Sequence, residues 1–262
     1  MAPAKSIVVV AFALAAGLGL SGCGARPPAA GAEGDAAAQE VSNLAPPRVD
    51  SVRLQNGGVV LAGAAPAGGL IRLATPAGEA TGATADAHGR WTIYLPASVE
   101  PRIFGLSVSE HGRQVQAEGY VLVTPQGQAA LLRAGTGALR IDPSMTPALR
   151  AIDFDRGGGM EVSAQVAPGA TVIVHLDGRQ AAEGRADAAG RYVASLGSQT
   201  AIRPGAHQVQ VSGDGFSDRV TAQVSPAAPL AQGPARSQLT PAGLRVDWMT
   251  PGGGVQSTLL VH

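Results

Sequence analysis

Apolar and polar residues alternate with a period of two over much of the chain after about residue 48. The pattern is clear in residues 219–225 (Arg-Val-Thr-Ala-Gln-Val-Ser), and it recurs in residues 172–176 and 209–211. Such a period puts every second side chain on one buried face, so it predicts β-strands. Turn-forming dipeptides such as Asp177-Gly178 separate the strands. No helical pattern is long enough to connect parallel strands, which predicts an all-β, antiparallel fold.

The chain contains an internal repeat. A shift of 101 residues, as from Asp86 to Asp187, aligns many positions without a gap. The matched pairs include Gly68 with Gly169, Gly89 with Gly190, Arg90 with Arg191, Trp91 with Tyr192, and Val123 with Val224. Duplication explains this alignment more simply than chance does. With about seven short strands in each copy, the repeat predicts two tandem β-sandwiches.

The N-terminus has the pattern of an export signal. One positive charge, on Lys5, precedes an uncharged and mostly apolar run over residues 7–20. As a helix this run would reach about 21 Å, short of the roughly 30 Å hydrocarbon core of a bilayer, which favours a signal peptide over a membrane-spanning helix. The run ends in Leu20-Ser21-Gly22-Cys23, which resembles the lipobox of bacterial lipoproteins.

The lipobox resemblance implies a lipid anchor. It implies cleavage between Gly22 and Cys23, a thioether-linked diacylglycerol on Cys23, and acylation, often with palmitate, that gives stable membrane attachment. Gly24 follows the cysteine, where enteric lipoproteins retained in the inner membrane have Asp. The expected location is therefore the outer membrane, with the periplasmic face favoured over the cell surface. A buried free cysteine is the alternative.

These patterns divide the chain into seven segments. After the signal peptide (1–22), residues 23–47 are rich in Ala, Gly and Pro and predict a flexible tether. The first β-sandwich domain is expected over 48–126 and the second over 149–226, joined by a connector (127–148) that could contain strands. A linker (227–241) and a C-terminal β-hairpin (242–262) complete the chain.

One turn motif occurs in both copies of the repeat. Asp86 precedes Gly89 by three residues, and Asp187 precedes Gly190 in the same way. This spacing predicts a hairpin turn in which the carboxylate accepts backbone N–H groups and the glycine has positive φ. An aromatic residue follows, as a core residue or as a sugar-stacking platform. With the Ala-Pro-Gly before a strand at 167–169, the motif resembles bacterial immunoglobulin-like modules, which serve as spacers, adhesins or glycan-binding units.

The C-terminal tail alternates in the same way as the domains. Leu244, Val246 and Trp248 form one apolar face, and Val255 to Val261 form a second strand. An isolated hairpin is marginally stable, so these faces need a surface to cover. One alternative is docking on the second domain, which would bury Trp248, and the other is strand pairing with another chain. If the tail stays free, Trp248 becomes a possible interaction aromatic.

Composition excludes several functions. Nineteen basic residues balance nineteen acidic ones, which argues against a nucleic-acid partner. Lys5 is the only lysine and Cys23 the only cysteine, so the mature chain lacks a P-loop lysine, a Schiff-base amine and a disulfide. The histidines are scattered, His88 occupies a turn, and no catalytic motif is present. No cofactor or metal is expected, and Asp86 and Asp187 fit turn caps better than calcium ligands.

The sequence therefore predicts a non-catalytic envelope lipoprotein whose modules act as structural spacers or as adhesion and protein-interaction units. The main alternative is a module that binds peptidoglycan or exopolysaccharide. A hydrolase with a carboxylate pair assembled by the fold is a third alternative.

Overall fold

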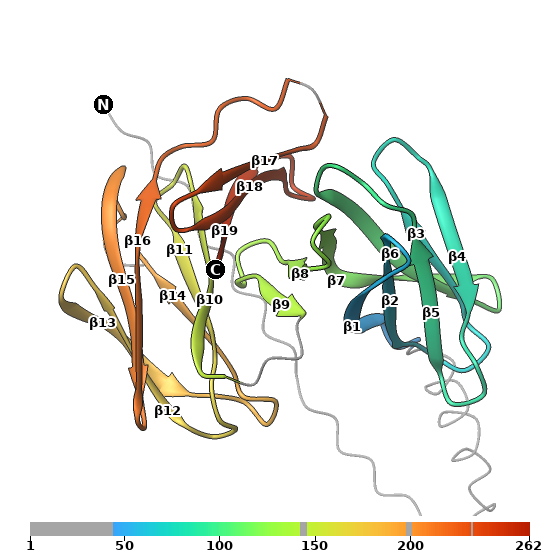
Figure 1. Ribbon diagram of the computed structural model, residues 1–262, viewed down its shortest axis with the longest axis horizontal. Helices are drawn as coiled ribbons and strands as arrows, with labels where there is room; N and C mark the ends of the chain where they lie inside the picture. Colours follow the sequence, from blue (N-terminus) through green and yellow to red (C-terminus); the bar gives the residue numbers. More distant parts are fainter. Residues whose placement is uncertain (1–43, 142–145, 198–200, 232) are drawn as a thin grey trace, which may run out of the picture. The chain divides into compact units, whose positions relative to one another are not determined.

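The computed structural model describes residues 44–141, 146–197, 201–231 and 233–262. Within these ranges it contains β-strands and no helix (Figure 1). The strands form two immunoglobulin-like sandwiches, each with its own hydrophobic core, as the sequence predicts. All strand pairs are antiparallel.

The first domain is built from two sheets. One sheet has the order β1-β2-β5 and the other the order β4-β3-β6-β7-β8-β9. Their strands are β1 (Arg48–Gln55), β2 (Gly58–Ala64), β3 (Leu70–Ala74), β4 (Ala80–Thr84), β5 (Arg90–Leu95), β6 (Arg102–Glu110), β7 (Arg113–Val123), β8 (Ala129–Leu132) and β9 (Leu139–Ile141). Side chains that alternate along these strands meet between the sheets, among them the fully buried Leu61, Leu73 and Leu106.

The second domain repeats this arrangement. Its sheets have the orders β14-β11-β10-β19-β18-β17 and β13-β12-β15-β16. Their strands are β10 (Ala148–Asp155), β11 (Met160–Gln165), β12 (Thr171–Leu176), β13 (Arg179–Arg185), β14 (Arg191–Leu196), β15 (Gly205–Gly213), β16 (Phe216–Val224), β17 (Ala235–Thr240), β18 (Gly243–Met249) and β19 (Val255–Val261). Strands β10 to β16 pair as β1 to β7 do, so the sequence repeat is also a repeat of topology.

Each domain has additional strands beyond the repeated seven. Strands β8 and β9 fall in the stretch that the sequence assigns to a connector, and they extend a sheet of the first domain. Strand β17 falls in the stretch assigned to a linker and pairs in unbroken register with β18. The expected C-terminal hairpin is present as β18 and β19. Strand β17 adds a third strand to it, which corrects the assignment of residues 227–241 to a linker. Its last strand, β19, pairs with β10 and so extends a sheet of the second domain (Figure 1).

A third core joins the additional strands of the two domains. It combines Leu122, Ala130, Leu132 and Ala138 from the first domain with Ala151, Leu244, Val246, Trp248 and Leu260 from the second. Because Leu259 and Val261 belong to the core of the second domain while Leu260 belongs to the third core, β19 is covered on both faces. The strands added after each repeat therefore bury apolar surface against each other.

Polar contacts accompany the third core. The loop between β8 and β9 meets the side chain of Gln256, whose carbonyl oxygen accepts a hydrogen bond from the Gly135 N–H at 3.1 Å. The Ala138 N–H donates to the buried Asp153 carboxylate at 2.6 Å. Both bonds join residues more than ten positions apart, so they fix this loop on the sheet of the second domain.

Candidate functional site

The repeated turn motif is closed by its aspartates. An oxygen of Asp86 accepts backbone hydrogen bonds from His88 at 2.8 Å and Arg90 at 2.9 Å, and these bonds lower the pKa of Asp86. Asp187 accepts the equivalent bonds from Ala189 and Arg191 at 2.8 Å. Gly89 and Gly190 have φ of 72° and 75°. The aspartates thus cap turns, which is a structural role.

The connection made by this turn differs from the expected hairpin. The motif links β4 to β5 in the first domain and β13 to β14 in the second, and in each case the two strands belong to different sheets. The turn therefore carries the chain from one sheet of the sandwich to the other. The spacing of aspartate and glycine determines only the local geometry of the turn. This geometry is the same in a hairpin within one sheet and in a connection between two sheets, so the sequence motif does not distinguish the two.

The aromatic residues considered as ligand-stacking groups are buried. Trp91 is 2% exposed and Tyr192 is 7% exposed, each within the core of its own domain. Trp248 is 1% exposed, and its ring meets Tyr120 edge-on with centroids 5.8 Å apart. Its indole N–H donates to the Thr258 hydroxyl at 3.0 Å. The tail docks within the chain and extends a sheet of the second domain, as one alternative expects. Trp248 is buried against residues of the first domain and not in the core of the second, which corrects that expectation and also its assignment as a possible exposed interaction residue.

A carboxylate pair does lie on adjacent strands of the second domain. Asp153 on β10 stands directly opposite Glu161 on β11. Burial raises the pKa of Asp153, while hydrogen bonds from Thr258, Ala138 and Gln256 act in the opposite direction. Burial, and next the charges of Asp153 and Asp155, raises the pKa of Glu161 to about 7. Asp153 is completely inaccessible, so a substrate cannot reach it and the pair cannot act as a hydrolytic centre.

A second titratable pair joins the turn after β12 to the start of β15. Nδ1 of His207 lies 2.7 Å from an Asp177 carboxylate oxygen, and Nε2 lies 2.8 Å from the Arg203 carbonyl oxygen. Burial alone would lower the pKa of His207, but these two hydrogen bonds outweigh it and raise the pKa. Both ring nitrogens are occupied, so His207 fastens a turn and is not a free base.

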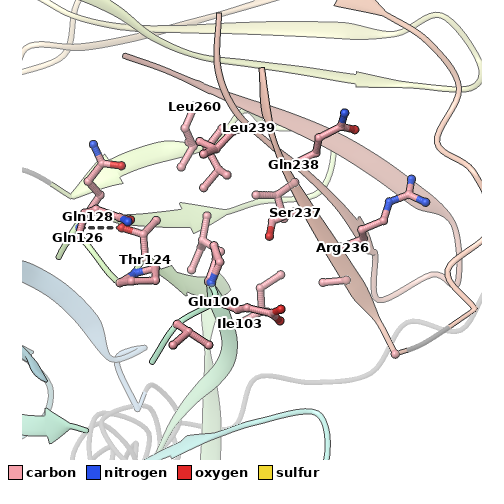
Figure 2. Close-up of a pocket in the computed structure, with 18 of the residues that line it drawn as sticks. Glu100, Ile103, Thr124, Gln126, Gln128, Arg236, Ser237, Gln238, Leu239 and Leu260 are labelled. Atoms are coloured by element: carbon pink, nitrogen blue, oxygen red, sulfur yellow. Dashed lines mark hydrogen bonds between the residues drawn. The ribbon is translucent and has the colours of Figure 1, made fainter. Parts of the chain in front are cut away.

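A groove of about 980 Å³ lies beside β17. Its floor consists of the buried Leu122, Leu244, Val246 and Leu260, which also belong to the third core. Strand β17 forms one wall. The segments around β6 and the β7–β8 turn form the other wall, which includes Val99. Glu100, Ile103, Thr124 and Gln128 also belong to this wall (Figure 2).

The walls of the groove carry unusually exposed apolar side chains. Leu239 on β17 is 77% exposed and Val99 on the opposite wall is 96% exposed. Leu239 and Ser237 point into the groove, whereas Arg236 and Gln238 point away from it (Figure 2). This alternation is that of a strand with one face on the groove. One wall of this site falls within residues 227–241, a stretch whose composition predicts a linker, so the sequence alone does not indicate the groove.

The lipobox residues Gly22 and Cys23 lie outside the described residues. Within the described ranges, no helix has the length and apolar character needed to span a bilayer. In the same ranges, no three His, Cys, Asp or Glu side chains are grouped so as to hold a metal ion.

Comparison with known proteins gives weak structural matches. No protein family and no curated protein matches the chain in sequence. The BSP domain of a biofilm-associated protein is 14% identical over 71% of this chain and 30% of that one, with a TM-score of 0.24. A 1.5-MDa bacterial ice-binding adhesin, described for its retention on the host cell surface, is 12% identical over 83% and 88%, with a TM-score of 0.23. The central fibronectin-III array of RIM-binding protein is 13% identical over 83% and 89%, with a TM-score of 0.27. At these TM-scores the matches carry no argument about function.

Proposed function

We propose that this protein is a non-catalytic lipoprotein of the bacterial cell envelope, anchored through lipid on Cys23. In this proposal its two immunoglobulin-like domains act as a structural spacer or as an adhesion and protein-interaction unit. The anchor holds the protein in the outer membrane, with the domains on the periplasmic face. The lipobox resemblance at Leu20 to Cys23 supports the anchor.

The third core is the observation that most supports a spacer. Tandem domains joined by a flexible linker move independently, because few contacts cross between them. Here the connector and the C-terminal tail both form strands, and their apolar faces pack against each other around Trp248. A chain that couples its domains in this way transmits load and orientation from one domain to the next.

Two further observations argue against the two alternatives, a hydrolase and a glycan-binding module. The carboxylate pair assembled by the fold is sealed, since Asp153 has no exposed surface. The glycan-binding alternative relied on aromatic platforms, and Trp91, Tyr192 and Trp248 are all in cores. Protein–protein contact is therefore the better-supported form of interaction.

The anchor is tested by Cys23→Ala with cell fractionation. We expect the variant to leave the membrane fraction and to accumulate as an uncleaved or soluble species, because lipid cannot be attached. Gly24→Asp is the companion variant, expected to keep the lipid but to shift the protein to the inner membrane. Unchanged membrane retention of Cys23→Ala would contradict the anchor.

A further inference from the structure

Strand β17 ends its sheet in a way that leaves backbone groups available. The sheet order runs β14-β11-β10-β19-β18-β17, so β17 has β18 on one side and no strand on the other among the described residues. An edge strand presents N–H and C=O groups that an added strand can satisfy. In many natural proteins a β-bulge or a proline prevents an edge strand from pairing with another chain. Strand β17 has neither, because it pairs with β18 over six residues without a register shift and contains no proline.

The groove reaches this backbone edge. The consecutive residues from Ala235 to Leu239 all line it, although alternate side chains of a strand point to opposite faces of the sheet. The side chains of Arg236 and Gln238 point away from the groove, so these residues line it through atoms close to the backbone. The lining by consecutive residues therefore places the backbone of β17 beside the apolar floor.

The floor of the groove is continuous with an interface that already exists in this chain. Leu122, Leu244, Val246 and Leu260 belong both to the groove and to the third core. Strands β19, β18 and β17 successively extend the sheet from β10, and their inward side chains cover the strands of the first domain. One further strand beside β17 would continue the same sheet and the same core.

We propose that this groove binds an extended segment of another protein as an added β-strand on β17. The partner chemistry follows from the walls: its backbone pairs with β17, and apolar side chains at alternate positions lie against Leu239 and Val99. Ser237, small and directed into the groove, leaves room over Val246 for one larger apolar side chain. Strand addition of this kind obtains affinity from the backbone and specificity from alternate side chains.

The geometry favours a peptide segment over a second folded copy of this chain. Pairing two copies through β17 would require each folded domain to enter the concave space between β17 and the wall that contains Val99 and Ile103. A single extended strand fills such a space without that conflict. The volume of about 980 Å³ is at the upper end of the range of about 300–1,000 Å³ that is usual for ligand sites.

The test uses the full chain in detergent and a pool of capped octapeptides. The peptides alternate Val, Leu, Ile or Phe with Ser, Thr, Asp or Arg, and bound members are identified by mass spectrometry. We expect saturable binding of a subset and protection of the amide hydrogens of residues 235–240 from exchange. Leu239→Asp should weaken binding at least tenfold. Leu70→Asp, at an apolar residue that is 58% exposed on β3, should leave it unchanged.

A backbone-modified peptide distinguishes strand pairing from apolar adsorption. The best binder is remade with N-methyl groups on alternate amides, in the two possible phases, because a methylated edge cannot donate hydrogen bonds to β17. One phase should lose binding and the other should keep it. The proposal is overturned if no peptide is enriched, if both phases bind as well as the parent, or if Leu239→Asp instead abolishes a dimer of the unliganded chain. These readouts do not depend on Cys23, so loss of the lipid anchor would leave them unaffected.

Discussion

Four glycines form two matched pairs that share a positive φ but differ in the space around them. Gly89 and Gly68 both have positive φ in the first domain, at 72° and 77°, and Gly190 and Gly169 match them in the second, at 75° and 71°. A Cβ atom built on Gly89 would lie 2.3 Å from the Ala65 carbonyl oxygen, and on Gly190 it would lie 2.2 Å from that of Val166. At Gly68 and Gly169 it would meet nothing within 4 Å.

The four Gly→Ala variants separate backbone strain from collision. At Gly68 and Gly169 only the positive φ is penalised, which costs about 1 kcal/mol. At Gly89 and Gly190 the same strain is joined by a contact with backbone, which cannot rotate away. The carbonyl oxygen of each of these two glycines also accepts a hydrogen bond at 2.8 Å, from the N–H of the same residue whose carbonyl the new Cβ would meet. Moving that residue away would weaken this hydrogen bond, which costs up to a further ~1 kcal/mol. We expect a total loss of about 2–4 kcal/mol at the latter two positions.

Scanning calorimetry measures the difference directly. A loss of 1 kcal/mol lowers Tm by about 4–8 °C in a domain of this size. Gly89→Ala should therefore lower the Tm of the first domain clearly more than Gly68→Ala, and Gly190→Ala should exceed Gly169→Ala in the second. His88→Ala, at the exposed position of the same turn, is the control and should change Tm little. Equal losses at Gly68 and Gly89 would refute the argument from the carbonyl contact.

Two further predictions concern the second domain and the third core. The pKa of Glu161 is about 7 in the folded protein and 4.5 in the unfolded chain, so the folded state binds more protons between these values and stability falls as pH rises from about 4.5 to 7. Glu161→Gln should therefore stabilise the second domain by about 1 kcal/mol at pH 8, after allowance for solvent screening, and should make no difference near pH 4.5. Urea titrations at both pH values measure the two free energies of unfolding. Equal effects of the substitution at both pH values would contradict the prediction. Trp248→Ala should cost about 3–5 kcal/mol and lower the melting of both domains, because Trp248 packs against strands of each. Met249→Ala, at the neighbouring 44% exposed side chain, is the matched control, and a loss confined to one domain would contradict the coupling.

The sandwiches were predictable because their signals are local and occur twice. Alternation with a period of two identifies strands with one buried face, and the 101-residue repeat shows where one unit ends and the next begins. The turn at Asp86 and Gly89 was predictable for the same reason, since an aspartate and a glycine three residues apart determine the hydrogen bonds between them. The choice between a hairpin and a crossing from one sheet to the other depends on the pairing of distant strands, which this spacing does not encode.

The candidate groove could not be predicted in the same way, although part of its signal is visible. Ala235, Ser237 and Leu239 alternate with polar residues just before Pro241, a pattern that indicates a strand and a tight turn in a stretch that was assigned to a linker. The exposure of Leu239 and its position opposite Val99 arise from the contact between strands of the two domains. No local pattern specifies which residues of the two domains this contact places opposite each other.

The last strand shows how the third core could have been recognised from the sequence. A strand with one face on a core and one in water alternates, but residues 258–261 read Thr-Leu-Leu-Val, with three consecutive apolar side chains. Consecutive apolar residues in a strand require cover on both faces, and the structure supplies it, since Leu259 and Val261 face one core and Leu260 the other. A tail that needs two surfaces cannot be a simple extension of one domain. Its sequence therefore already implied that a second body packs against the sheet, and the connector strands β8 and β9 were the unassigned segment available to provide it.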